Sequence, residues 1–476
     1  MGENFPDWLT KPMIRGIKSF NIDSYLLALE GWRRGLNLTW YYDTPHDTDI
    51  KLIGFNPIGK IYSLSSEDKK HYFYRSRGDK VPNKAVDIAS SKDETKQHLA
   101  SNGVNVPSGK NFDSSFTSEE IINESLSMGY PLAIKPTLGS LGNGVFTDVN
   151  SKEDLEYAVN YIRNELDYND VLVEQHIEGE EYRVYVVGEE VVACTLKEAP
   201  NVIGNGTDSI NNLIEQKNEL RKQNPHLSRK LIKIDNQLKK QLDKINYSLD
   251  SLLESNKKIY LNTVANTSIG GESNNLKDEQ IPSSVKHEAI KAISVFPKLD
   301  HAGLDIIVRE NQAYVIEINT TASFLQHIFP LKGEPINVCA KIIDHYYPET
   351  KDVSINSKVY FNYKKVSDLL KDRLVQSVEI TNLDSNNTYV KRYIISGKVQ
   401  GVGYREWARR EASRSRINGY VKNLKNGNVV VIAWTSSNEK LMEFEQKLWQ
   451  GSKKSSVEQV KELKWDKQIN VGFEIR

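Results

Sequence analysis

Three side chains with oxygen ligands lie in two neighbouring apolar segments of the chain. Asp305 lies within GLDII, and Glu317 and Asn319 lie within VIEIN. Both segments have the composition of buried β-strands, where a polar side chain is costly unless it binds a partner. Hard oxygen ligands suit Mg²⁺ that bridges phosphate groups. We therefore predict a metal site from these residues; the alternative is a hydrogen-bonded structural cluster.

A lysine and a run of glycines follow an earlier apolar strand. Lys135 belongs to the strand PLAIKP, and the glycine-rich segment LGSLGNGV, residues 138–145, begins shortly after it. Glycine lets backbone amides approach phosphate oxygens closely, and a lysine supplies a fixed positive charge. The glycines that can serve here are Gly139, Gly142 and Gly144. A phosphate-binding loop is one interpretation, and a plain turn after a strand is the other.

Carboxylates gather in the segment VLVEQHIEGEEYRV. Glu174, Glu180 and Glu181 all lie close in sequence to Arg183. Carboxylates beside a backbone hinge can accept hydrogen bonds from an adenine amino group and from ribose hydroxyls. The alternative is an exposed acidic turn that uses Arg183 as its ion-pair partner.

A second candidate anion site lies near the C-terminus. The segment SGKVQGVGYR runs from a strand through a glycine-punctuated loop into a helix that begins near Arg405. Consecutive backbone amides at a helix N-terminus form an anion cradle, and an arginine can close it with a bidentate contact. Asn423 follows in GYVKN, directly before the turn LKNGN.

Periodicity predicts the elements that position these residues. Apolar residues at helical spacing predict helices over 22–36, 93–100 and 283–299, and apolar runs predict strands over 38–42 and 51–55. Residues 211–258 carry widely spaced leucines and isoleucines, which favours a solvated helical insertion over a coiled-coil partner site. Residues 388–476 read strand, helix, two strands, helix, strand and a terminal strand, close to a ferredoxin-like unit.

Composition excludes several classes of function. Lys and Arg balance Asp and Glu at 63 each, which argues against a general affinity for nucleic acid or anionic membranes. Cys194 and Cys339 have no partner motif and are expected to be buried, free thiols in a reducing compartment. We find no apolar signal segment and no run long enough to span a membrane. A cytoplasmic protein is expected, and a homo-oligomer is compatible with the sequence.

The order of these motifs resembles the ATP-grasp superfamily over Lys92 to about Asp344. The resemblance implies that Lys92 and Lys135 are the two nucleotide-binding lysines. It also implies that Glu174, Gln175 and Ile177 belong to the adenine hinge and that Glu181 binds ribose. Asp305, Glu317 and Asn319 match the family's metal ligands. ATP and Mg²⁺, or Mn²⁺ in its place, are the implied cofactors.

Within that superfamily the chain is similar to cyanophycin synthetase and the fused glutathione synthetases. The stretches that carry this likeness are CTLKEAPNVIGNGTDSINNLI and LNTVANTSIGGESNN. The likeness implies an amino acid or peptide substrate and places Lys197 near the γ-phosphate or the acyl phosphate. Asn205 and Thr207 depart from the family's usual glycine-acidic run.

Residues 388–476 resemble acylphosphatase over essentially their whole length. The loop VQGVGYR and the segment GYVKN match that family's pattern, with Tyr404 in place of the commoner phenylalanine. The resemblance implies that Arg405 binds the phosphate and that Asn423 orients the attacking water. A degenerate module kept for binding is the alternative.

The sequence thus predicts a multidomain protein of mixed α/β and α+β class. The expected parts are an N-terminal α/β domain (1–90), an ATP-grasp domain (91–350), a connecting region (351–387) and an acylphosphatase-like domain (388–476). The expected function is an ADP-forming carboxylate–amine ligase that acts through an acyl phosphate and carries an acylphosphatase activity. An ATP-binding regulatory protein that has lost one or both chemistries is the competing class.

Overall fold

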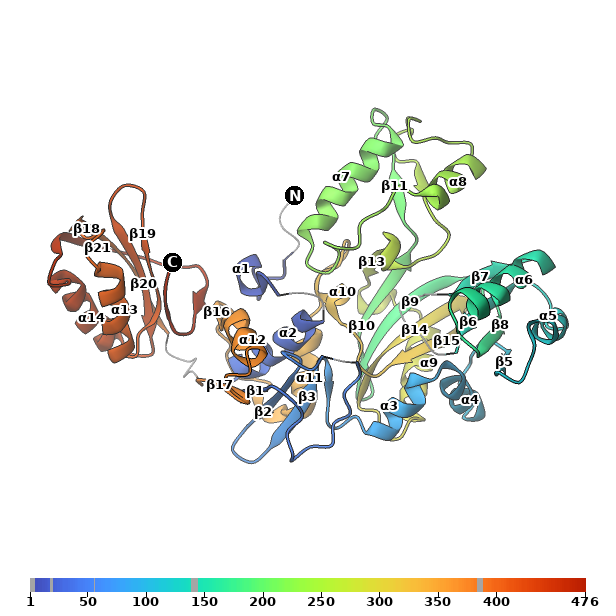
Figure 1. The fold of residues 1–476 in the computed structure, drawn as a ribbon, viewed down its shortest axis with the longest axis horizontal. Coiled ribbons are helices and arrows are strands. Elements are labelled where there is room, and N and C mark those ends of the chain that lie inside the picture. The colour runs from blue at the N-terminus through green and yellow to red at the C-terminus, as the bar shows by residue number, and fades with distance from the viewer. Residues whose placement is uncertain (1–4, 18–19, 55, 138–143, 383–387) are drawn as a thin grey trace. The chain divides into compact units, whose positions relative to one another are not determined.

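The computed structural model describes residues 5–17, 20–54, 56–137, 144–382 and 388–476. The chain divides into two compact units. Residues 76–342 form one unit, and residues 5–75 join residues 343–476 in the other. Figure 1 shows the elements of each unit in chain order from blue to red. The mixed α/β and α+β class that the sequence predicts is confirmed.

The N-terminal segment builds a helix and a sheet. The predicted helix is present as α2 (Asn21–Arg33), which is buried over nearly its whole length. Strands β1 (Asn37–Tyr41), β2 (Ile61–Ser65) and β3 (Lys70–Tyr74) pair antiparallel in that order. The strand expected over 51–55 is wrong for residues 51–54, which form no strand, and residue 55 lies outside the described residues.

This sheet takes its edge strand from the far end of the chain. Strand β17 (Ser377–Ile380) pairs antiparallel with β1, so that Leu38 lies opposite Ile380. The helix α12 (Tyr363–Lys371) joins the same unit, because the Tyr363 hydroxyl donates to the Gly59 carbonyl at 2.6 Å. The sequence prediction treated 351–387 as a separate connecting region, whereas its described residues complete the N-terminal α/β fold.

The first lobe of unit 76–342 contains a four-stranded sheet. Its order is β5-β8-β6-β7, with β5 at Gly109–Phe112, β6 at Leu132–Pro136, β7 at Phe146–Val149 and β8 at Val171–Gln175. Helices α5 (Ser118–Leu126) and α6 (Lys152–Asn160) contribute their apolar faces to its core. Helices α3 (Asn83–Ser90) and α4 (Lys92–Ser101) precede the sheet, and α4 confirms the predicted helix 93–100.

The second lobe contains a five-stranded antiparallel sheet in the order β13-β10-β9-β14-β15. The bounds are Glu180–Val187 for β9, Glu190–Glu198 for β10, Glu272–Asn275 for β13, His301–Arg309 for β14 and Gln312–Asn319 for β15. Helix α9 (Ser283–Ser294), close to the predicted 283–299, packs its apolar residues on this sheet. The opposite face carries Lys197, Glu181, Arg183, Asp305 and Glu317.

The insertion between β10 and β13 has a core of its own. Helices α7 (Ile210–Gln223) and α8 (Asn236–Lys244) confirm the helical character expected over 211–258. A small sheet of β11 (Asn201–Ile203) and β12 (Lys258–Tyr260) closes the insertion, which the leucine spacing did not indicate.

The C-terminal residues fold in the predicted order. The elements are β18 (Tyr389–Lys398), α13 (Tyr404–Arg414), β19 (Asn418–Asn423), β20 (Val429–Thr435), α14 (Asn438–Gln450), β21 (Ser456–Leu463) and β23 (Phe473–Ile475). They form a sheet in the order β21-β18-β20-β19-β23. Both helices pack apolar residues against one face of that sheet.

The remaining elements are short apart from one helix. They are α1 (Lys11–Ile14), β4 (Arg77–Gly78), α10 (Leu325–Ile328), α11 (Val338–Tyr346), β16 (Val359–Tyr360) and β22 (Ile469–Asn470). Short helical turns cover Tyr161–Glu165, Thr267–Ile269, Asp278–Gln280 and Pro348–Thr350. Cys194 and Cys339 are both buried cysteine thiols, as predicted. Within the described ranges no helix combines the length and apolarity that crossing a membrane requires.

Candidate functional site

One face of the second-lobe sheet carries a row of charged side chains from four neighbouring strands. Lys197 on β10 lies opposite Glu181 on β9, and Arg183 on β9 lies opposite Asp305 on β14. Asp305 in turn lies opposite Glu317 on β15. Because directly opposed residues share a face of a sheet, the pairing register alone gathers these five groups on one surface.

The charges in this row compensate one another. The Arg183 guanidinium donates to Asp305 Oδ2 at 2.7 Å, and the Lys197 ammonium lies 3.2 Å from Asp305 Oδ1 and also pairs with Glu181. Burial disfavours the charged form of Asp305, but these two cations outweigh burial and hold the pKa of its carboxyl below the usual range. Asp305 therefore stays ionised in a nearly dry setting.

Glu317 and Asn319 extend the row to the edge of the sheet. They stand two residues apart on β15 and so share its face. With the Asn319 amide oriented to satisfy both its atoms, its nitrogen donates to Glu317 Oε1 and its oxygen accepts from Arg183 Nη1, each at 3.2 Å. Across the described ranges no three Asp, Glu, His or Cys side chains form a metal-binding group by themselves. The donor types of Asp305, Glu317 and Asn319, two carboxylates and an amide, nevertheless include the oxygen ligands that Mg²⁺ prefers.

The first-lobe sheet holds a second buried charge cluster. Lys135 on β6 and Lys96 on α4 each place their ammonium 2.6 Å from a different oxygen of Glu174 on β8. Burial alone would raise the pKa of the Glu174 carboxyl, but the two lysines outweigh it and lower the pKa. Glu174 thus anchors Lys135 directly before the glycine-rich loop.

Lys92 links the two clusters electrostatically. It begins α4, and its backbone amide lies 3.4 Å from the Thr137 carbonyl, just after Lys135. Burial lowers the pKa of Lys92, against the opposing attraction of Glu317 on one side and Glu174 on the other. Lys92 is therefore within electrostatic reach of Glu317 in the second lobe and of Lys135 and Glu174 in the first.

The other predicted nucleotide residues are placed as follows. Gly139 and Gly142 lie outside the described residues. Gly144 has a left-handed backbone at φ +71°, and an added Cβ would lie 2.8 Å from the Leu166 side chain, so glycine is favoured there. Ile177 is buried just beyond β8. The backbone N–H of Gln175 donates a hydrogen bond to the Ser108 carbonyl at 2.8 Å.

The C-terminal loop between β18 and α13 forms a separate cradle. Gly401 and Gly403 have φ values of +72° and +77°, and a Cβ added at either would meet open space. Among the described residues, the backbone amides of residues 400–403 have no recorded acceptor, and Arg405 has no recorded ion pair. Unpaired amides at a helix N-terminus beside an unpaired arginine constitute a site for an anion.

Asn423 lies at the end of β19, on the strand side of this cradle. Its side-chain oxygen is buried and has no hydrogen-bond partner among the described residues. Gln400 fixes the cradle to the following hairpin, since its side-chain nitrogen donates to the Leu424 carbonyl at 2.8 Å and the Asn428 carbonyl at 2.7 Å. An unsatisfied buried acceptor is costly unless it serves a ligand, and a water molecule is a suitable donor.

Comparison with known proteins matches both regions. The model of the ATP-grasp domain family matches residues 89–322, and that of acylphosphatase matches residues 391–475. The chain combines an ATP-grasp domain with an acylphosphatase domain. Both resemblances predicted from the sequence are thereby confirmed.

Curated relatives share the ATP-grasp part. Cyanophycin synthetase of Trichormus variabilis is 33% identical over 281 residues, which cover 57% of this chain and 30% of the synthetase. The glutathione biosynthesis bifunctional protein of Clostridium perfringens is 31% identical over 65% of this chain and 42% of its own length. The crystal structure of a bifunctional glutathione synthetase from Pasteurella multocida has 24% identity and a TM-score of 0.47, over 61% of this chain and 41% of that one. The chain thus spans less than half the length of these relatives.

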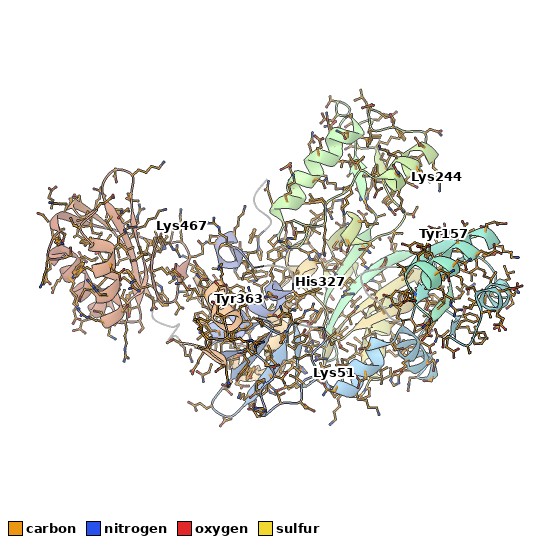
Figure 2. All side chains as sticks on the ribbon, in the orientation of Figure 1. Lys51, Tyr157, Lys244, His327, Tyr363 and Lys467 are labelled. Atoms are coloured by element: carbon orange, nitrogen blue, oxygen red, sulfur yellow. The ribbon has the colours of Figure 1, made fainter. Side chains whose placement is uncertain are left out.

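Sequence reasoning missed two features of the ATP-grasp domain. Lys96 follows Lys92 by four residues, so the helical spacing that puts both on one face could have revealed it. His327, labelled in Figure 2, is fully buried with Nδ1 3.1 Å from the Thr195 hydroxyl, and burial lowers its pKa to about 3. No local sequence pattern predicts this contact, because 132 positions separate the two residues.

The acidic-turn alternative for Arg183 is wrong, since its carboxylate partner is Asp305.

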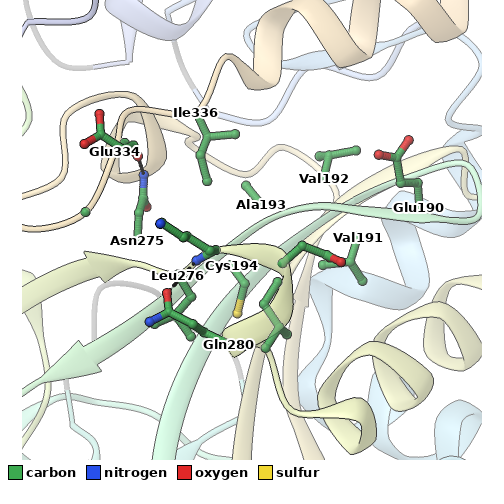
Figure 3. A pocket seen from close by; sticks show the side chains of 14 residues that line it. Glu190, Val191, Val192, Ala193, Cys194, Asn275, Leu276, Gln280, Glu334 and Ile336 are labelled. Atoms are coloured by element: carbon green, nitrogen blue, oxygen red, sulfur yellow. Dashed lines mark hydrogen bonds between the residues drawn. The ribbon is translucent and has the colours of Figure 1, made fainter.

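The ATP-grasp domain also contains a cavity away from these charges. Its volume is about 640 Å³, and Figure 3 shows Ala193, Cys194, Asn275 and Ile336 among its lining residues. None of the predicted site residues lines it. We therefore base the nucleotide site on the charged faces of the two sheets and not on this cavity.

Removing the Glu174 charge is expected to destabilise the ATP-grasp domain. Glu174→Gln leaves Lys135 and Lys96 buried without their counter-ion, which should lower the free energy of unfolding by about 3 kcal/mol. The matched control is Glu124→Gln, which breaks the exposed pair with Lys110 and should cost less than about 1 kcal/mol. Urea unfolding of both variants at neutral pH makes the comparison, and equal losses would contradict the buried role of Glu174.

The Glu174 carboxyl should also change how the stability of the protein depends on pH. A carboxyl whose pKa is lowered in the folded state contributes stability above its unfolded pKa of about 4.3 and loses that contribution as the pH falls further. The unfolding free energy of the unaltered protein should therefore drop more steeply below about pH 4.3 than that of Glu174→Gln.

Proposed function

We propose that this protein is an ATP-dependent carboxylate–amine ligase that activates an amino acid or peptide carboxylate as its acyl phosphate. The observation that carries the proposal is the row of Lys197, Glu181, Arg183, Asp305 and Glu317 on one sheet face. Lys92 lies within electrostatic reach of Glu317 and of Lys135. Fixed cations beside oxygen ligands are what phosphoryl transfer to a carboxylate requires. The amino acid or peptide class is supported by the relatives, which are synthetases of cyanophycin and glutathione.

Each of these residues has a proposed role in binding ATP or in stabilising the acyl phosphate. Lys92 and Lys135 bind phosphate oxygens of ATP, and Glu181 accepts from ribose. Asp305, Glu317 and Asn319 would hold Mg²⁺, or Mn²⁺ in its place, which would neutralise charge on the phosphates. A carboxylate oxygen of the substrate attacks the γ-phosphorus, and the bond to ADP breaks. Lys197 and Arg183 offset the negative charge that then lies on the acyl phosphate.

The second half of the reaction forms the amide. The amine nitrogen attacks the carbonyl carbon of the acyl phosphate, loses a proton, and phosphate leaves. Hydroxylamine is a small, strong nucleophile, so it should replace the amine and trap the intermediate as a hydroxamate. A screen of amino acids and dipeptides for ADP release from MgATP identifies the active carboxylate for this assay.

Hydroxamate formation is the expected result with any carboxylate that stimulates ADP release. It is measured by ferric chloride colour and by mass spectrometry of the product. ADP release that never yields a hydroxamate would contradict an acyl phosphate, and AMP as the nucleotide product would exclude the mechanism.

We further propose that the C-terminal domain hydrolyses acyl phosphates. Arg405 and the free amides of the cradle would hold the phosphate, and Asn423 would orient a water molecule through its unsatisfied oxygen. Water then attacks phosphorus, the bond to the acyl oxygen breaks, and carboxylate and phosphate leave. A tethered site of this kind would meet a stranded ligase intermediate at high effective concentration, which is a form of editing.

A further inference from the structure

The acylphosphatase domain carries a strong positive charge within a chain that is neutral as a whole. Residues 388–476 contain 18 Lys and Arg against nine Asp and Glu, a net charge of +9. The remaining residues must carry the compensating excess of acid. A charge imbalance of this size, confined to one domain, raises the local concentration of anions.

The cations are not evenly compensated over this domain. On helix α13 and beside it, Arg409 pairs with Glu406, and both Arg414 and Lys447 pair with Glu411. Nine exposed lysines of this domain have no recorded ion pair within the described residues. Five of them are Lys398, Lys422, Lys425, Lys453 and Lys454, and the others are Lys440, Lys461, Lys464 and Lys467.

The first five of these lysines belong to the segments that border the phosphate cradle, and Lys422 directly precedes Asn423. Lys398 ends β18, where the cradle loop begins. Lys425 lies in the hairpin turn that Gln400 ties to the loop. Lys453 and Lys454 follow Ser452, whose hydroxyl donates to the Val402 carbonyl of the loop at 3.2 Å.

The same three segments contain no carboxylate. Residues 396–405, 422–428 and 451–455 include neither Asp nor Glu. The phosphate of a simple acyl phosphate is already matched by Arg405 and the loop amides. The five further lysines therefore provide positive charge beyond what the phosphate group needs.

We propose that the acylphosphatase site selects acyl phosphates whose acyl group carries additional carboxylates. The five lysines attract these carboxylates and retain them near the cradle while water displaces the acyl oxygen from phosphorus. The inference rests on the proposed acylphosphatase activity and specifies its substrate class. It requires no particular arrangement of the two units of the chain.

A matched series of substrates tests this selectivity in the full-length protein. The probes are benzoyl phosphate, 4-carboxybenzoyl phosphate and 3,5-dicarboxybenzoyl phosphate, which differ only in charge far from the reacting bond. At about 0.01 M salt, kcat/KM should rise about tenfold from the first to the last. At about 1 M salt, where the Debye length is about 3 Å, the preference should vanish.

Two triple variants locate the effect. Lys425→Gln with Lys453→Gln and Lys454→Gln should remove most of the preference for the dicarboxylated probe. The control combines Lys440→Gln, Lys461→Gln and Lys464→Gln, which removes the same charge from the opposite end of the sheet, where Lys461 lies opposite Ile394. The control should keep the preference, because its lysines do not border the cradle.

The outcomes separate this inference from the activity on which it rests. A protein inert toward all three probes contradicts the acylphosphatase activity itself. Equal kcat/KM for the three probes, or equal losses in the two triple variants, overturns the selectivity alone. Strong inhibition by single-stranded RNA without any carboxylate preference would also overturn it, and would assign the lysines to nucleic acid.

Discussion

Glu317→Gln is expected to abolish ADP formation while leaving the fold intact. The substitution keeps the shape of the side chain but removes one of two carboxylate charges offered to the metal. Metal neutralisation of charge in the transition state contributes several kcal/mol, so turnover should fall by about a hundredfold or more. Steady-state ADP release with the active carboxylate measures the effect.

The control for this variant lies on the same hairpin. Glu310→Gln makes the same chemical change in the exposed turn between β14 and β15, where the side chain is 86% exposed. It should turn over ATP at the unaltered rate. If Glu317→Gln does so as well, the metal assignment is wrong; if both variants lose activity together with stability, the hairpin itself has been disturbed.

Arg405→Ala is expected to abolish hydrolysis of benzoyl phosphate by the full-length protein. The phosphate loses its paired cation, and an arginine that stabilises a transferring phosphoryl group contributes about a thousandfold or more to the rate. Arg410→Ala, which removes an exposed arginine from the same helix, should have no such effect. Release of phosphate measured at saturating substrate makes the comparison.

Asn423→Ala tests the proposed acylphosphatase site independently of Arg405. It should slow hydrolysis by about a hundredfold through loss of water orientation, with little change in KM. In the full chain with ATP and the carboxylate but no amine, both variants should also release less phosphate per ADP. Equal phosphate release from the unaltered protein and Arg405→Ala in that assay would exclude editing, while leaving the isolated hydrolysis untouched.

Sequence patterns predicted the elements whose contacts are local. Helix α2 and the C-terminal order of strands and helices follow from apolar spacing within short windows. Strand β17, which the sequence did not predict, depends on a partner distant in the chain. Strand β17 is a four-residue segment whose identity as a strand depends on pairing with β1, about 340 positions earlier. Such a pairing leaves no periodic signal within its own window.

In the candidate site too, local sequence patterns predicted some residues, whereas roles that depend on distant contacts were missed. Asp305, Glu317 and Asn319 could be selected because polar residues stand out within apolar strands. The role of Glu174 as the counter-ion of two lysines could not, because Lys96 and Lys135 come from a helix and a strand that meet only after folding. The ligand roles of all these residues remain predictions for the experiments above.

The edge strand β17 has a consequence for how this protein is made on the ribosome. Strand β1 (Asn37–Tyr41) is translated about 340 residues before its antiparallel partner Ser377–Ile380. At a synthesis rate of about 5–20 residues per second, the hydrogen-bonding edge of β1 stays without its partner strand for tens of seconds. The ATP-grasp unit, residues 76–342, is complete before then and can fold first. During that interval the nascent N-terminal segment exposes an unpaired strand edge, which is the form most open to chaperones and to pairing with neighbouring chains.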